Sequence, residues 1–165
     1  MIEVAPHPRV LTALADAGVG YTVHQHADCL ISIRGPGDFA RCLARPIDVV
    51  TKTLLLEFTG ACGETEFALA VCPVNRRADF ATLARSWNCG RLRLASRDRL
   101  ADRLDYPANG VSPLGCDACP VALDDSLFSF DTIFVGAGVA GVELEMSPLD
   151  LQQACRATRL DFARL

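Results

Sequence analysis

The single lysine of this chain is the first candidate for chemistry. Fifteen of its sixteen basic side chains are arginine, and Lys52 stands alone in the apolar, β-branched run Val-Val-Thr-Lys-Thr-Leu-Leu-Leu. Where arginine is the default cation, a position that keeps lysine is a candidate site for a compact ammonium. Side chains alternate along a strand, so one face would carry Val50, Lys52, Leu54, Leu56 and Phe58. We expect Lys52 at the edge of a cleft, facing an anion or a polarised oxygen; the alternative is an ammonium that reaches solvent at a sheet edge.

Two glycine-rich segments are candidates for backbone contact with a ligand. In Asn109–Gly115 (Asn-Gly-Val-Ser-Pro-Leu-Gly), Gly110 permits close approach and Pro113 stiffens the turn. An ordinary surface loop is the alternative. Gly136–Gly141 matches GxGxxG, but Val142–Met146 alternates like a strand, whereas a dinucleotide site requires a helix at this point. We expect a tight hairpin turn there that could line a pocket.

Nucleophilic, metal and thiol chemistry find little support. The three histidines lie within the first 26 residues, and no GxSxG occurs. Cys116-Asp-Ala-Cys119 lacks a second pair at zinc spacing and ends in a loop, so we expect no metal and no thioredoxin-like centre, although the two thiols could still oxidise. Asp124 and Asp125 could orient a substrate amine or cap a helix. Catalysis must then rest on positioning and electrostatics.

Length and composition predict one globular domain. The chain has 165 residues, 50% of them hydrophobic and 22% charged, which is enough for a substantial core. It starts without a basic stretch followed by an apolar one, and no stretch is apolar enough to span a bilayer. We expect a cytoplasmic protein without membrane contact, in which most of the eight cysteines are reduced.

Charge is unevenly distributed along the chain. The formal net charge is −4, yet residues 76 to 103 hold eight arginines against three aspartates, a local net charge of +5. Such a segment could follow a phosphate backbone. The alternative is a solvated helix face with aspartate partners.

Apolar periodicity and turn signals predict alternating helices and strands. We expect helices at 6–17, around 39–43, at 79–87, from Ser96 to Leu104, and after Ser147 at the C-terminus. We expect strands at 21–24, 49–58, 67–71, 92–95, 121–123, 132–135 and 142–146, with a loop at 106–117. The pattern predicts an α+β fold: a single domain over residues 1–165, with a mixed central β-sheet flanked by helices.

Five segments resemble, in order, the segments of one known family. They are Val50–Leu56, Leu69–Val74, Asn109–Gly115, Pro120–Asp124 and the tail Thr132–Leu151. Together they are similar to the YbaK and prolyl-tRNA synthetase-associated editing domain family, over nearly the whole chain. Domains of this family, free-standing or inserted, hydrolyse misacylated tRNA. The tail is most similar to the YbaK branch.

The resemblance implies a trans-editing aminoacyl-tRNA deacylase that acts on the acceptor end of aminoacyl-tRNA, with prolyl-tRNA synthetase as a candidate partner and no cofactor. It implies catalytic roles for Lys52, Gly110 and Ser112, and substrate-binding roles for Thr53, His26, Val111, Pro113, Asp124 and Gly138. A substrate group or a water would attack the ester, which suits a chain without a nucleophilic triad.

Substrate choice rests on the same resemblance and on two departures from it. Cys-tRNA(Pro) is the favoured substrate, ahead of alanyl, seryl and threonyl esters. His26 stands where the YbaK branch often has a tyrosine, and Asp28–Arg34 replaces a threonine-rich stretch, so the size of the pocket is left open. A catalytically inactive tRNA- or nucleotide-binding module of the same fold is the alternative, because a fold does not guarantee chemistry.

Overall fold

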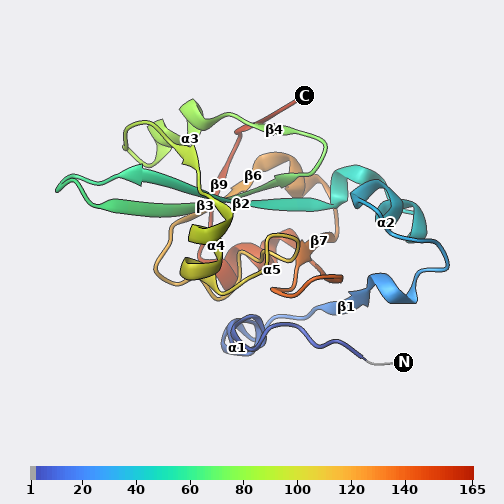
Figure 1. Cartoon of the computed structure of the whole chain (residues 1–165). Helices are drawn as coiled ribbons and strands as arrows, with labels where there is room; N and C mark the ends of the chain where they lie inside the picture. The colour runs from blue at the N-terminus through green and yellow to red at the C-terminus, as the bar shows by residue number, and fades with distance from the viewer. Residues whose placement is uncertain (1–2) are drawn as a thin grey trace.

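Residues 3–165, which the computed structural model describes, form five α-helices, ten strands and three short 3-10 helices (Figure 1). The α-helices are α1 (Pro8–Ala17), α2 (Pro36–Cys42), α3 (Phe80–Ser86), α4 (Arg97–Leu104) and α5 (Pro148–Cys155). The strands are β1 (Thr22–Gln25), β2 (Thr51–Thr59), β3 (Thr65–Pro73), β4 (Arg77–Ala78), β5 (Arg93–Leu94), β6 (Val121–Asp124), β7 (Ile133–Gly136), β8 (Val142–Met146), β9 (Thr158–Leu160) and β10 (Ala163–Arg164). The 3-10 helices are η1 (His26–Asp28), η2 (Ile47–Val49) and η3 (Asp125–Ser129).

The main sheet has five strands in the order β5-β2-β3-β6-β9. Its centre is the antiparallel hairpin of β2 and β3, in which Leu55 lies opposite Leu69. Strand β6 runs parallel to β3, and β9 runs parallel to β6, so the sheet is mixed. Long β-branched and apolar runs favour central strands of this kind, because both faces are buried.

Separate apolar clusters cover the two faces of this sheet. Leu56 and Ala70 face α3, where Leu83 and Phe162 complete one cluster. The neighbouring Leu55 faces the larger cluster, formed with α1, α5 and the second sheet. In Figure 1, α3 lies on one side of the sheet and α1, α4 and α5 lie on the other. The period of two along β2 thus divides its side chains between the two cores.

A second sheet of three antiparallel strands, β1-β8-β7, meets the start of β2. Val50, which follows η2, forms a parallel bridge with Phe134 of β7. The Thr51 hydroxyl donates a hydrogen bond to the Phe134 carbonyl oxygen at 2.8 Å. Strands β7 and β8 are joined by the turn between Gly136 and Gly141, as the sequence predicts. This junction between the two sheets holds the candidate site.

The predicted fold class is confirmed: the chain is a single α+β domain with a mixed sheet flanked by helices. One prediction for the lysine strand is wrong. Val50 does not share a face with Lys52, because β2 begins only at Thr51 and the Val50 side chain packs in the cluster that contains Phe134. The short strands β4, β9 and β10 were not predicted, and each pairs with a strand that lies far away along the chain.

Six cysteines are free thiols, in line with the expectation that most are reduced. The exception is a disulfide between Cys29 and Cys42, which links the segment after η1 to the last residue of α2. Among residues 3–165, no helix combines the length and the apolar character needed to cross a membrane.

Candidate functional site

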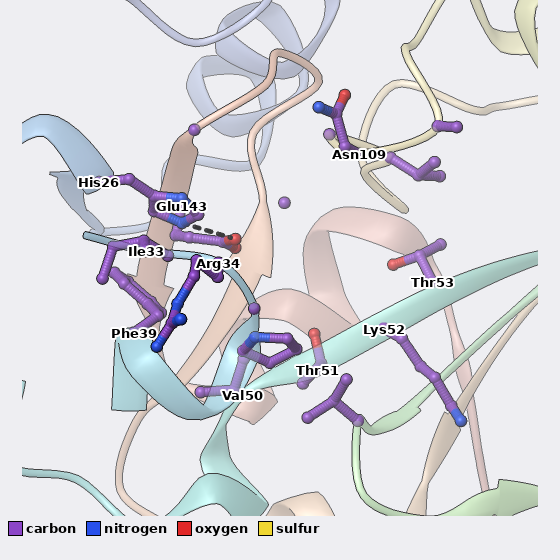
Figure 2. Close-up of a pocket in the computed structure, with 18 residues that line it drawn as sticks. His26, Ile33, Arg34, Phe39, Val50, Thr51, Lys52, Thr53, Asn109 and Glu143 are labelled. Carbon is purple, nitrogen blue, oxygen red and sulfur yellow. Dashed lines mark ion pairs between the residues drawn. The ribbon is translucent and has the colours of Figure 1, made fainter. Parts of the chain in front are cut away.

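A cavity of about 420 Å³ opens at the junction of the two sheets (Figure 2). Its walls come from segments that are distant in sequence: residues 33–36 with Phe39, residues 50–53, residues 108–111, and the ends of the β7–β8 hairpin. His26 and Val74 complete the lining. A cavity of this size is in the range of small-molecule sites.

Thr51 and Thr53, near the start of β2, present their side chains on the cavity face of the strand (Figure 2). The Thr51 hydroxyl already donates its hydrogen bond to the Phe134 carbonyl oxygen. The Thr53 hydroxyl oxygen is enclosed and has no hydrogen-bond partner within residues 3–165. Because a buried hydroxyl without a partner is costly, Thr53 is available to a ligand.

Lys52 leaves β2 on the other face, opposite Thr51 and Thr53 (Figure 2). It lies at the rim of the cavity, and its ammonium donates to the Arg76 carbonyl oxygen at 2.5 Å. In register it lies opposite Cys72, within the cluster that packs under α3. The ammonium thus faces a polarised oxygen at a cleft edge, but that oxygen belongs to the protein.

The two glycine segments touch backbone to backbone at one wall of the cavity. A Cβ on Gly110 would lie 2.5 Å from the Val139 carbonyl carbon and oxygen. A Cβ on Gly136 would lie 2.2 Å from the Val111 carbonyl oxygen. Glycine at both positions is therefore a requirement of close packing between the two loops, whereas the sequence suggested Gly110 for close approach to a ligand.

Within the loop, the N–H groups are unequally available. The Gly110 N–H donates to the Pro107 carbonyl oxygen at 3.0 Å and so serves the turn itself. The Val111 N–H has no hydrogen-bond partner within residues 3–165, and Val111 lines the cavity. The Val111 N–H is therefore a backbone donor that this loop can offer to a ligand, whereas the Gly110 N–H is not.

Four of the residues predicted for the site lie outside the cavity lining. Ser112 is fully buried, and its hydroxyl oxygen accepts from the Leu114 N–H at 3.2 Å. The Pro113 carbonyl oxygen accepts from the Cys155 thiol at 3.4 Å. Gly138, with φ +80°, packs against His7 and Tyr106. Ser112, Pro113 and Gly138 therefore contribute to the structure of the two loops but do not line the cavity.

Asp124 also lies outside the lining, and its carboxylate is fully occupied. Only 1% of the residue is exposed. It caps η3 through the Ser126 N–H at 3.1 Å, and it accepts from the N–H groups of Phe162 and Ala163 at 3.0 and 2.7 Å. These bonds hold the C-terminal segment onto the sheet, which is the capping alternative and leaves no oxygen free for a substrate amine.

The other predicted residues, Lys52, Thr53, His26, Gly110 and Val111, do meet at the cavity. The sequence analysis missed Glu143 and Arg34, and it named Asn109 only as part of the loop. Glu143 had a signal in the sequence: Glu143 and Glu145 alternate along β8, as His24 and His26 alternate at β1.

Two histidine–glutamate pairs result from that alternation. His24 Nε2 lies 2.8 Å from Glu145 Oε2, and His26 Nε2 lies 3.5 Å from Glu143 Oε1. Only the second pair faces the cavity (Figure 2). The His26 ring also packs against Phe39, with the ring centroids 4.8 Å apart, which fixes its position on the wall.

Thiol chemistry at the CxxC pair is disfavoured. Burial raises the pKa of Cys116 to about 12 and raises that of Cys119 as well. Because the thiolate is the reactive form, neither cysteine is an activated nucleophile near neutral pH. Of the residues that the structure describes, those that line the cavity include no cysteine and no serine.

The arginine-rich segment, residues 76–103, contains β4, α3, β5 and all of α4 except Leu104. Seven of its eight arginines are exposed, Arg76 being the exception. Arg93 and Arg99 both face Glu57, at 3.5 and 3.4 Å. Arg91, by contrast, has no ion-pair partner within residues 3–165. Part of the segment is therefore a paired face, and part of it is free to meet another charge.

Comparison with known proteins identifies the family of this chain and relates its fold to solved structures. The family model of the aminoacyl-tRNA editing domain matches residues 32–154. A solved structure of a candidate trans-editing enzyme for prolyl tRNA synthetase superposes with a TM-score of 0.79 at 21% identity, over 95% of this chain and 96% of that one. The hypothetical protein APE2540 has the same TM-score and identity, over 94% and 99% of the two chains. At this level of identity, the structural likeness establishes the fold alone.

Proposed function

The chain belongs to the aminoacyl-tRNA editing domain family, and from that premise we propose that it is a trans-editing aminoacyl-tRNA deacylase. The reaction is hydrolysis of the ester that joins a wrong amino acid to the acceptor end of a tRNA. Cys-tRNA(Pro) is the first substrate to test, because the tail resembles the YbaK branch. The structural neighbour named for prolyl tRNA synthetase makes tRNA(Pro) and that synthetase the first partners to test.

One observation carries the proposal. Residues 32–154, which the family model matches, contain every cavity segment except His26. The part of the chain that identifies the family is thus the part that builds the cavity. Its volume of about 420 Å³ suits a small aminoacyl group with part of the terminal nucleoside.

The polar groups of the cavity suit an ester reaction without a protein nucleophile. Thr53 offers an unpartnered hydroxyl, and Val111 offers an unpartnered N–H within residues 3–165. We assign these two donors to the ester carbonyl, whose oxygen gains negative charge as the tetrahedral intermediate forms. Within residues 3–165 the lining holds no serine or cysteine, and the Thr53 hydroxyl has no hydrogen-bonded base to activate it, so a water or a group of the substrate is assigned the attack on the carbonyl carbon. The protein then contributes orientation and charge stabilisation.

Lys52 is the proposed cationic partner of the acceptor end. Its four-carbon stem lets the ammonium exchange the Arg76 carbonyl oxygen for a phosphate or ester oxygen at the rim. A phosphate carries a full negative charge and so attracts an ammonium more strongly than a neutral carbonyl does.

A non-catalytic binding module is the second candidate, and the same lysine supports it. In this structure the ammonium stabilises the turn between β3 and β4 through Arg76 and points away from the cavity. If that is its only role, the cavity binds an acceptor end or a nucleotide without cleaving an ester.

The test is ester loss from a panel of tRNA(Pro) charged with cysteine, alanine, serine, threonine or proline. We expect the purified protein to release one non-cognate amino acid and to spare proline. Binding of the same tRNAs without release of any amino acid would favour the binding module.

A further inference from the structure

Two glutamates on β8 occupy very different surroundings. Glu143 and Glu145 lie two residues apart and so share one face of the strand. The Glu145 carboxylate is satisfied by the Thr132 hydroxyl at 2.7 Å, by His24 at 2.8 Å and by Arg45 at 3.0 Å. Burial would raise the pKa of Glu145, but these hydrogen bonds outweigh it and lower the pKa. Glu145 is a structural anchor.

Glu143 has none of these partners. Its side chain is only 18% exposed and lines the cavity, yet its carboxylate accepts no hydrogen bond from any residue between 3 and 165. The nearest cation-forming group, His26 Nε2, is 3.5 Å away, beyond a good hydrogen bond. That nitrogen is itself enclosed and has no hydrogen-bond partner within the described residues. A partly buried carboxylate that accepts no hydrogen bond from the protein favours binding of a cationic group of a ligand.

The chemistry of the site limits which cation that is. Among residues 3–165 no three metal-ligating side chains gather, so one carboxylate and one imidazole face a ligand rather than a metal ion. A primary ammonium supplies up to three N–H donors and a full positive charge, which is what Glu143 lacks.

The position of Glu143 suits one particular ammonium. Figure 2 shows Glu143 and His26 on one side of the cavity and Thr53 and Asn109 on the other. In an aminoacyl ester, the α-amino group is bonded to the carbon next to the ester carbonyl. With the carbonyl held at Thr53, rotation about the bond between these two carbons can turn the α-ammonium toward Glu143.

We propose that Glu143 binds the α-ammonium group of the aminoacyl ester. This inference rests on the proposed function and adds a selection rule: the site takes esters with a free α-amino group and rejects N-acylated ones. Discrimination is expected because an N-acyl group removes the positive charge and leaves Glu143 unpaired in a partly buried site.

The test uses an acceptor-stem RNA of tRNA(Pro) that carries alanine through a non-hydrolysable amide at its 3′ end. We would measure the Kd of this probe and of its N-acetylated form for the wild type, Glu143→Gln and Glu143→Asp. The wild type should prefer the free amine at least tenfold, Glu143→Gln should lose that preference, and Glu143→Asp should keep part of it. Glu145→Gln is the matched control and should retain the preference, with thermal melting verifying that each variant is folded.

An equal preference in the wild type and in Glu143→Gln would overturn the inference, and so would a wild type without any preference. Ester hydrolysis measured in parallel separates the two levels of the account. Wild-type hydrolysis with no amine preference would overturn the role of Glu143 alone. Failure to bind either probe and failure to hydrolyse any ester would overturn the proposed function as well.

Discussion

The Val111 carbonyl oxygen packs so closely against Gly136 that a Cβ on Gly136 would lie 2.2 Å from this oxygen. This contact joins the loop at 108–111 to the β7–β8 hairpin and thereby sets one wall of the cavity. Two backbones can approach this closely only where a side chain is absent. The glycines of the two loops are thus part of the site's construction, although they carry no reactive group.

Gly136→Ala should therefore displace the loop and disturb the cavity. Overpacking of this kind costs about 1–3 kcal/mol of folding stability, and each kcal/mol lowers the Tm by about 2–4 °C in a chain of this size. We expect a lower Tm together with a loss of ester hydrolysis, measured by thermal melting and by a deacylation assay.

Gly20→Ala is the matched control, because a Cβ at Gly20 meets nothing within 4 Å. It should leave both the Tm and the activity close to wild type. A Gly136→Ala variant that melts and reacts like wild type would show that the close contact does not shape the site.

Most of the fold could be predicted from periodicity, because long apolar runs with clear turn signals leave few alternatives. Strand β2, for example, is predicted at 49–58 and is found at Thr51–Thr59. Strands β9 and β10 could not be predicted, since each is short and pairs with a strand distant in sequence. Their pairing depends on tertiary contacts, among them the hydrogen bonds that the Phe162 and Ala163 N–H groups donate to the Asp124 carboxylate.

The candidate site was predictable only in part, for physical reasons that differ between residues. Loop residues with special backbone needs, such as Gly110, can be recognised by their residue type. The orientation of Lys52 cannot be predicted from the sequence, because it depends on where β2 begins and on the hydrogen bond to the Arg76 carbonyl oxygen. Glu143 becomes a candidate only once β1 and β8 are known to pair, which sets it beside His26.

Lys52→Ala separates the catalytic role of the lysine from a structural one. If the ammonium stabilises the reacting ester or holds the acceptor phosphate, ester hydrolysis should fall by roughly 10²–10³-fold, as on removal of one oxyanion donor. Removal of the hydrogen bond to the Arg76 carbonyl oxygen should lower the Tm by about 3–12 °C, because a charge-assisted hydrogen bond contributes about 1.5–3 kcal/mol and each kcal/mol is worth about 2–4 °C. Unchanged turnover with a lowered Tm would mean that Lys52 only stabilises the β3–β4 turn.

Replacing Arg91 and Arg93 by alanine tests whether the arginine-rich segment meets the tRNA backbone. We expect weaker tRNA binding at low salt, and a plot of log affinity against log salt that is less steep by about 0.7–0.9 for each phosphate that is no longer neutralised. Filter binding over a salt series measures both quantities. Arg156→Ala, an exposed arginine outside the segment, is the control. An unchanged slope in the double variant would assign Arg91 and Arg93 to the solvated face.

The disulfide between Cys29 and Cys42 encloses the cavity residues 33–36 and Phe39 in a closed loop. A cross-link that closes a loop of about 15 residues contributes about 3 kcal/mol to stability. A reducing agent should therefore lower the Tm of the wild type by several degrees. The double variant Cys29→Ser with Cys42→Ser should melt at the lower temperature with or without the reagent. A wild-type Tm that does not respond to reductant would contradict this contribution.

The most direct test of the account is the rate of amino acid release from tRNA(Pro) charged with cysteine, measured beside the same tRNA charged with proline. The account predicts multiple turnovers on the cysteinyl ester or on another small non-cognate ester, no release of proline, and a strong dependence on Lys52. If none of the esters in the panel is hydrolysed faster than in buffer, the assignment as a deacylase is contradicted.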